Sequence, residues 1–290
     1  MDQFKKIAFQ NRKKPHTQFD LLRLEALFER KNLDHSIESL HKVDFFAMLF
    51  IEKGTGYHTI DFTDYHCSKG TVLTIRKDQI QKFFKSPNLK GFLLLFTNDF
   101  LVSYLQKSEA HKVLLLFNEL LANPKIQLND KAHADIKSIY ARIEKEYFAI
   151  HDGHSMEIVR SELHILITKL FRIKARQEKL DVEKKYLSDF IAFQKLVEQH
   201  AIKTTKVQDY AKLMGVSSKT LNTITKSILH KTAKAFIDEI QVKQIKRLLI
   251  NTKLSVKEIA YRSGFNETTN FYKYFKRHTG FTPENFRATY

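Results

Sequence analysis

The chain has 290 residues, of which 43% are hydrophobic, so it can form two folded domains and is not an intrinsically disordered protein. Its formal net charge is +17, and residues 191–290 alone contain 18 basic and 7 acidic side chains, which points to a polyanionic partner for the C-terminal end. A single cysteine, Cys67, a basic N-terminus without an apolar stretch, and apolar runs too short to span a bilayer lead us to expect a cytoplasmic protein without disulfide, signal peptide or membrane contact.

Residues 44–98 combine β-branched and aromatic segments with glycine turns, which is typical of strands. Turns are expected at 53–56 and 68–70. The expected strands are 44–52, 57–62, 71–75, 80–84 and 91–97. Short strands at this spacing predict a sandwich or a small barrel. Its aromatic residues offer candidates for a pocket: Phe45, Phe46, Phe50, Tyr57, Phe62 and Tyr65.

From about residue 98 the apolar residues follow a helical period, which predicts helices within 99–122, at 130–150 and at 155–178. The last of these helices has apolar residues at spacings of 4, 3, 4 and 3, the pattern of a two-heptad seam. We predict that this seam forms a dimer interface through Val159, Leu163, Leu166, Leu170 and Ile173. A second apolar surface leaves open the alternative that the helix is buried within its own domain: Ile158, Ile165, Ile167 and Phe171. The polar stretch 176–185 is typical of a linker.

Residues 207–226 have the pattern of a helix-turn-helix unit. Ala211 is small enough for a second helix to cross the first closely, and Gly215 can adopt the positive φ that the turn needs. Ser217 can cap the second helix, and Leu221 and Ile224 form its inner face. The opposite face presents Lys219, Asn222, Thr223 and Lys226, which are side chains that can read base edges or hold phosphate.

The pattern repeats in residues 256–277, where Ala260 and Gly264 keep the same four-residue spacing. Phe271 and Phe275 lie one turn apart as inner-face residues, and 232–249 is predicted as one long helix between the two units. A single Ala-x-x-x-Gly is weak evidence, but two copies in a basic segment favour DNA binding over a plain helical bundle. Lys226, Lys276 and Arg277 are expected to hold phosphate.

The second unit resembles the arabinose-regulator (AraC/XylS) family of transcription regulators. The resemblance rests on Ile259–Phe265, on Phe271 and Phe275–Arg277, and on Thr279–Pro283 with Phe286-Arg287, while Gly215–Ser217 and Leu221-Asn222 resemble the first unit of that family. The base-reading positions of the family fall on Lys219, Asn222, Thr223, Thr269 and Lys273. This chain departs from the family pattern at Thr223 and Lys273, where arginine is frequent, at Thr225, where phenylalanine is usual, and at His230, where glycine is usual.

The resemblance implies an α+β chain with a small cupin-like β-barrel followed by an all-α DNA-binding domain. We expect a cupin-like effector-binding and dimerisation domain in 1–180, with the barrel at about 40–98 and helices at about 99–178. A linker in 181–188 and a double helix-turn-helix domain in 189–290 would follow. The implied partners are double-stranded DNA, a second copy of the chain, a small-molecule effector and RNA polymerase. We expect an activator, with repression as the open alternative.

A metal-dependent cupin enzyme is the alternative from another class. That chemistry needs two or three histidines and a carboxylate around one metal. His58 lies in the appropriate strand, but Ile60 stands two residues on and Gln81 occupies the place where a later histidine is common. We therefore expect no catalysis, no metal and no cofactor. A dimeric regulator that works without any ligand is the remaining alternative.

Overall fold

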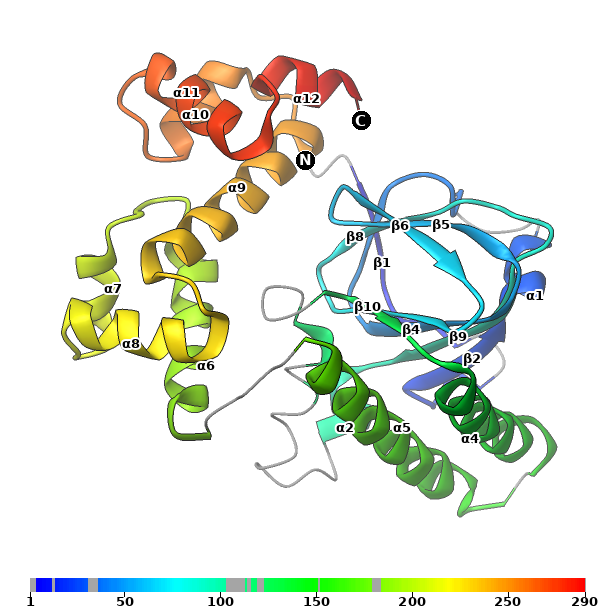
Figure 1. The fold of residues 1–290 in the computed structure, drawn as a ribbon. Helices are drawn as coiled ribbons and strands as arrows, with labels where there is room; N and C mark the ends of the chain where they lie inside the picture. Colours follow the sequence, from blue (N-terminus) through cyan, green and yellow to red (C-terminus); the bar gives the residue numbers. More distant parts are fainter. Residues whose placement is uncertain are drawn as a thin grey trace. The chain divides into compact units, whose positions relative to one another are not determined.

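The computed structural model describes residues 4–11, 14–30, 36–102, 113, 116–118, 123–150, 152–178 and 184–289. The chain divides into two compact units, one within 4–180 and one within 181–290. The first unit combines β-sheets with helices and the second is helical, which confirms the predicted α+β class (Figure 1).

The described strands of the first unit form two sheets of five strands each (Figure 1). The first sheet has the order β1 (Lys5–Ile7), β3 (His41–Val43), β8 (Ile80–Phe83), β5 (Thr55–Ile60) and β6 (Thr63–Ser68). The second has the order β10 (Lys125–Gln127), β7 (Thr71–Ile75), β4 (Phe46–Lys53), β9 (Lys90–Phe96) and β2 (Phe19–Arg23). Only β1 and β3 pair in parallel among these strands. Where the sequence predicts a sandwich or a small barrel, the structure therefore has two sheets, and no strand pairing joins them among the described strands.

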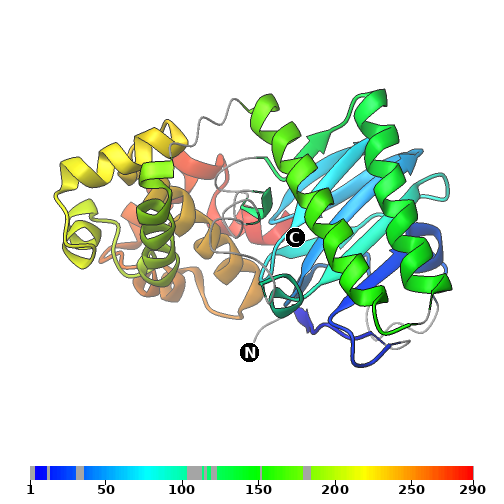
Figure 2. The same ribbon diagram turned by 90° about the horizontal axis from the view of Figure 1, so that it is seen from below.

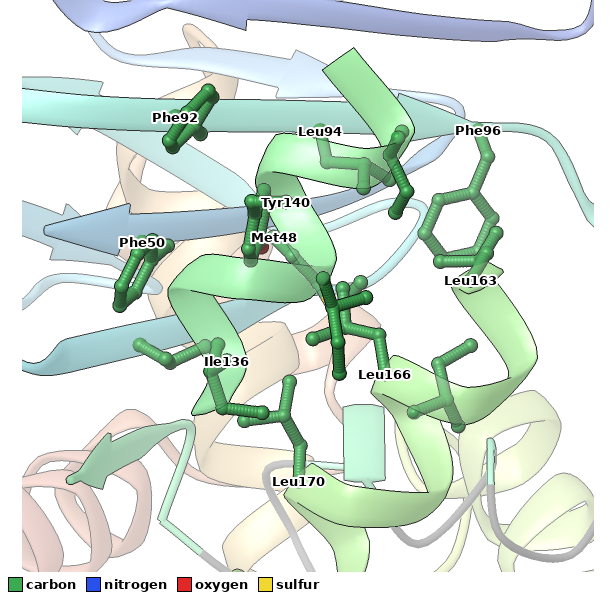
Figure 3. Close-up of a cluster of buried hydrophobic side chains, with 14 of the residues drawn as sticks. Met48, Phe50, Phe92, Leu94, Phe96, Ile136, Tyr140, Leu163, Leu166 and Leu170 are labelled. Atoms are coloured by element: carbon green, nitrogen blue, oxygen red, sulfur yellow. The ribbon is translucent and has the colours of Figure 1, made fainter. Parts of the chain in front are cut away.

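Side-chain alternation along β4 gives the second sheet two buried faces. Ala47, Leu49 and Ile51 belong to a core shared with the first sheet. Met48 and Phe50 point to the other side, where they pack with Phe92, Leu94 and Phe96 under two helices (Figure 3). A strand that is buried on both faces is a nearly continuous apolar run, which is the reason that Phe46–Lys53 is so hydrophobic.

Two long helices cover the outer face of the second sheet: α4 (Asp130–Ala149) and α5 (Ser155–Gln177) (Figure 2). The shorter α1 (Leu24–Phe28) and α2 (Asn98–Val102) also belong to this unit. Asn129 caps α4 by accepting a hydrogen bond from the backbone N–H of Ala132, so this helix begins where its sequence provides a cap. Of the helices predicted within 99–122, most residues lie outside the described part of the chain.

The structure corrects the assignment of the α5 seam. Val159, Leu163, Leu166 and Leu170 are buried in the core that α4, α5 and the second sheet share, and Ile173 packs against that core. Figure 3 shows Leu163, Leu166 and Leu170 on the side of α5 that meets this core. These side chains fill the space between the helix and the strands of their own domain, so they cannot form an interface with a second copy of the chain. On the other side of α5, Ile158 and Ile165 are 45% and 41% exposed.

The second unit is organised around the long helix α9 (Ala233–Asn251). At one end lie α6 (Lys184–His200), α7 (Val207–Leu213) and α8 (Ser218–Leu229), and at the other end lie α10 (Val256–Arg262), α11 (Thr268–Thr279) and α12 (Pro283–Thr289) (Figure 1). The helix α6 occupies part of the expected linker. It packs Phe190 and Phe193 against Phe236 of α9. Arg287 of α12 donates to the carbonyl oxygen of Leu249 in the last turn of α9, at 2.8 Å, and to that of Leu254 in the segment after this helix, at 2.7 Å.

Candidate nucleic-acid interface

The first helix-turn-helix unit consists of α7 and α8. Gly215 has a φ of +65° in the turn, and the N–H of Val216 donates to the carbonyl of Ala211 at 3.0 Å. Ser217 caps α8 by accepting from the N–H of Thr220 at 3.0 Å. Leu221 and Ile224 are buried on the inner face. The turn thus forms at the positions that the spacing indicated.

The outer face of α8 exposes Lys219, Thr223 and Lys226, but it does not expose Asn222 to the same extent. Asn222 is half-buried, and both ends of its carboxamide are engaged. Its Oδ1 accepts from the N–H of Ala233 at 3.0 Å, and its Nδ2 donates to the carbonyl of Ser218 at 3.1 Å. Reading adenine through two hydrogen bonds needs both ends of the amide, so this conformation does not offer Asn222 to a base.

The threonine hydroxyls of α8 bond back to their own helix. Thr223 donates to Lys219 at 3.1 Å and Thr225 to Leu221 at 2.8 Å, each to a carbonyl one turn earlier. Thr225 is completely buried, so it fills the inner-face position where the family usually has phenylalanine. The hydroxyl is compatible with that position because its hydrogen bond is satisfied locally.

The second unit consists of α10 and α11. Ser255 and Glu258 form a capping box at the start of α10, and Gly264 has a φ of +80° in the turn. A Cβ at Gly264 would lie 3.0 Å from the carbonyl oxygen of Lys203, so close backbone packing also favours glycine there. Phe271 and Phe275 are buried and stacked, with ring centroids 6.1 Å apart.

The outer face of α11 exposes all four residues that the sequence assigned to DNA: Thr269, Lys273, Lys276 and Arg277. Asn270 is exposed beside them, and no hydrogen bond joins it to the described residues. Asn270 is not among the residues that the sequence pattern indicated for DNA binding. Its spacing of three residues from Lys273 could have found it, because residues three apart share a helix face.

The helix α11 is attached to α9 through a buried carboxylate. Asp238 of α9 accepts from the hydroxyl of Tyr274 at 3.0 Å and from the ammonium of Lys234 at 2.5 Å. Burial, together with the carboxylate of Asp238, raises the pKa of Tyr274 well above its usual value, so the phenol keeps its proton and remains a donor. This contact fixes one side of α11 and leaves the opposite side exposed.

The turn glycines of the two units are 49 residues apart. After the turns, each residue of the first unit corresponds to the residue 50 positions later in the second unit. Leu221 matches Phe271, Thr225 matches Phe275, and both members of each pair are buried. The left-handed C-cap His230, with a φ of 55°, matches Gly280, with a φ of 79°. Thr232 and Thr282 both accept a backbone hydrogen bond at the start of the next helix. The additional residue therefore lies in the second turn.

The N-terminal unit contains a row of polar side chains on the inner face of its first sheet. His58 lies opposite Tyr65, and Gln81 lies opposite His41 on the neighbouring strands. The Nε2 of His58 is 3.1 Å from Oε1 of Gln81, whereas its Nδ1 is buried without a hydrogen-bond partner among the described residues. Burial lowers the pKa of His58 to about 3, so its imidazole is neutral.

The predicted pocket aromatics separate onto different faces. Phe45 and Tyr65 pack in the core between the sheets, whereas Phe46 and Phe50 face the helices and Tyr57 is exposed.

Burial also raises the pKa of Cys67 to about 11, which keeps this thiol protonated. Among the described residues, no group of three or more histidine, cysteine, aspartate or glutamate side chains has the arrangement of a metal site. No described helix is both long and apolar enough to cross a membrane.

Two family profiles match the chain. The profile described as "AraC-like ligand binding domain" matches residues 24–154, and the one described as "Helix-turn-helix domain" matches residues 210–289. Curated relatives include the HTH-type transcriptional activator RhaS of Enterobacter sp., which is 25% identical over 256 residues that cover 85% of this chain and 86% of the relative. RhaS of Escherichia coli O1:K1 is 24% identical with the same coverage.

Solved structures with similar chains include ToxT from Vibrio cholerae with a bound unsaturated fatty acid. It has 17% sequence identity and a TM-score of 0.42, and the match covers 93% of this chain and 94% of that chain. The C-terminal domain of the response regulator yesN from Fusobacterium nucleatum has 22% identity and a TM-score of 0.33, and it matches 34% of this chain.

Proposed function

We propose, for a chain that belongs to the AraC/XylS family of transcription regulators, that α8 and α11 enter two successive major-groove segments of one DNA site. The observation that carries the proposal is the pair of exposed basic faces on two matching helices that α9 joins. Lysine and arginine faces of this kind attract the phosphate backbone, and helices of this size fit the major groove. Residues 189–290 are the DNA-binding domain in this proposal, and residues 1–180 form the regulatory domain.

Within this interface, base edges would be read by Lys219, Thr223, Thr269 and Lys273, and phosphates would be held by Lys226, Lys276 and Arg277. All seven side chains are exposed on the two recognition helices. Base contacts give specificity, and phosphate contacts give affinity and register. Asn222 is removed from the base-reading set because of its two hydrogen bonds within the protein.

The test is selection of binding sites from randomised DNA by the purified protein, followed by titration of Lys273→Ala on the selected site. The variant should lose preference at one base pair, at a cost of about 1–3 kcal/mol for the original base. An exposed lysine of the N-terminal unit serves as the control, since Lys145→Ala removes the same charge outside the interface. Failure of the protein to enrich any sequence would contradict the proposed function.

The dimer interface that we propose is the exposed face of α5 on a second copy of the chain. Ile158 and Ile165 lie seven residues apart on this face, and Arg172 continues the same stripe. An antiparallel pairing centred on Ile165 would place the acidic Glu157 of each copy near Arg172 of the other. Charge complementarity thus favours a two-fold symmetric pair through this helix.

The effector that we propose is a neutral small molecule with hydroxyl or N–H donors, bound between the sheets of the N-terminal domain. The supporting observation is the buried Nδ1 of His58, which is an acceptor when Nε2 donates to Gln81. A compound that raises the unfolding temperature of the wild type but not of a His58→Phe variant would support this role. A regulator that works without any ligand would show no compound-dependent change in DNA affinity.

The remaining properties of the proposed regulator follow from its class. It is not an enzyme, it works in the cytoplasm, and it contacts RNA polymerase as an activator. Bound metal at one equivalent per chain in the purified protein would instead favour a metal-dependent cupin enzyme.

A further inference from the structure

We infer that Asn222 is a positioning residue, which fixes the first recognition helix to α9, and that Asn270 supplies the exposed carboxamide that reads a base. The inference rests on the proposed DNA-binding function and changes the role of one residue within it. Its basis is the hydrogen-bonding of two asparagines at different places on the two recognition helices.

The hydrogen bond from Ala233 to Asn222 joins two helices at a point where a donor needs a partner. The first N–H groups of a helix have no acceptor within that helix. Thr232 satisfies one of them, the N–H of Ala235, at 3.2 Å. Asn222 satisfies another from outside the helix, and Ala233 itself is completely buried, so water cannot replace the amide there. The contact therefore holds the N-terminal half of α8 against the beginning of α9.

The second unit supports this role independently. Tyr272 occupies the position equivalent to Asn222, and its hydroxyl donates to the side chain of Glu284 in the first turn of α12. Pro283, the counterpart of Ala233, has no N–H to donate. The same helix position thus joins the recognition helix to the following helix in both units, with the chemistry that the following residue permits.

The helix α9 transmits the position of α8 to the second recognition helix. Asn222 attaches α8 to the first turn of α9, and Tyr274 attaches α11 to Asp238, five residues further along the same helix. The separation and angle of the two recognition faces consequently depend on both contacts. Loss of either contact should reduce the affinity penalty that the protein shows when the spacing between the two parts of its DNA site is changed.

Asn270 has the opposite environment. It is exposed on the face that Lys273 and Arg277 share, and within the described part of the chain its amide has no hydrogen-bond partner. An asparagine amide that is free at both ends can pair with adenine in the major groove.

The test compares Asn222→Ala, Asn222→Asp and Asn270→Ala with the wild type. Each full-length protein is titrated against the selected site, against all single-base variants of it, and against sites with one base pair inserted or deleted between the two parts. Circular dichroism and an unfolding temperature establish that each variant is folded.

Asn222→Ala should bind every site at least tenfold more weakly with unchanged base preference, and its penalty for altered spacing should shrink. Asn222→Asp should retain the spacing penalty, because a carboxylate still accepts from Ala233 and suits a helix N-terminus. Asn270→Ala should retain the spacing penalty and lose preference at one base pair by roughly 5- to 150-fold.

Loss of preference at a single base pair in both Asn222 variants, with the spacing penalty unchanged, would overturn the inference. If Asn222→Ala does not fold, the Asp variant decides, since a base-reading amide would lose its preference there as well. Absence of DNA binding by the wild type would instead overturn the proposed function, so the two failures are distinguishable.

Discussion

His58 is held in a buried place where it cannot gain a proton easily. Its ring makes an edge contact with Phe83, with centroids 4.4 Å apart. Gln81 and Tyr65 lie on the two strands next to it, and His41 lies on the strand beyond Gln81. Desolvation by burial is the main cause of its lowered pKa, and the nearby His41 lowers the pKa further. A residue of this kind couples the stability of the N-terminal domain to pH.

The pH dependence follows from the two pKa values of His58. The unfolded chain binds this proton below about pH 6.5, whereas the folded chain binds it only near pH 3. Stability is therefore complete above about pH 6.5 and is lost as pH falls toward 3. Between pH 7.5 and 5.0 this residue should reduce the unfolding free energy by about 2 kcal/mol. Denaturant unfolding of wild type and of His58→Gln at both pH values measures it, and an identical pH dependence of the two proteins would contradict it.

Two residues show what sequence could not predict at this scale. The hairpin between β5 and β6 turns at Asp61 and Phe62, whose φ values of 46° and 66° are unusual for such residues, so neither glycine nor asparagine marks the turn. The strand Thr63–Ser68 was missed for that reason. Asn222 was assigned to the exposed face of its helix, whereas its hydrogen bond to Ala233, 11 residues away, depends on tertiary packing that a helical period does not reveal.

At the scale of elements, sequence predicted regular segments well and their environment less well. The strand Thr71–Ile75 and the helix Ser155–Gln177 appear where the pattern indicated them. The two apolar surfaces of α5 have similar composition, so periodicity alone could not decide which of them meets the sheet. The helix Lys184–His200 was missed because its polar beginning was interpreted as linker, although Phe190 and Phe193 anchor it.

The two faces of α5 should respond differently to truncation. Leu163→Ala should reduce the unfolding free energy by about 2–5 kcal/mol, because it opens a cavity in the core. Ile165→Ala should change it by less than about 0.5 kcal/mol in the monomer and should weaken dimerisation. Chemical denaturation and sedimentation would measure these effects. Equal loss of stability in both variants, without any change in association, would remove the exposed face of α5 as the proposed interface.

At the scale of the whole molecule, the uneven charge determines how the protein meets DNA. The C-terminal hundred residues have 18 basic and 7 acidic side chains, and the recognition helices expose lysines and an arginine. The positive field brings DNA to this end of the chain regardless of base sequence, and the base contacts then select the site.

Salt titration should count the phosphate contacts. The logarithm of the binding constant should fall linearly with the logarithm of salt concentration, with a slope of about −0.9 for each phosphate neutralised. Lys226→Ala, Lys276→Ala and Arg277→Ala should each make the slope shallower by about 1. Lys145→Ala, which removes an exposed charge from the N-terminal unit, should leave the slope unchanged. A slope that responds equally to all four substitutions would indicate a general charge effect without defined contacts.

The offset of 50 residues between the two helix-turn-helix units means that the chain contains two versions of the same fold, which can be compared position by position. Several positions of α8 have a counterpart of the same burial but a different side chain in the second unit, such as Thr225 and Phe275, and the C-cap residues His230 and Gly280 are matched in the same way. Exchanging the members of a pair asks what each side chain contributes when the surrounding fold is held constant. The two units within one chain can also diverge separately. The base preference of one unit can then change while the other unit still recognises its original part of the DNA site.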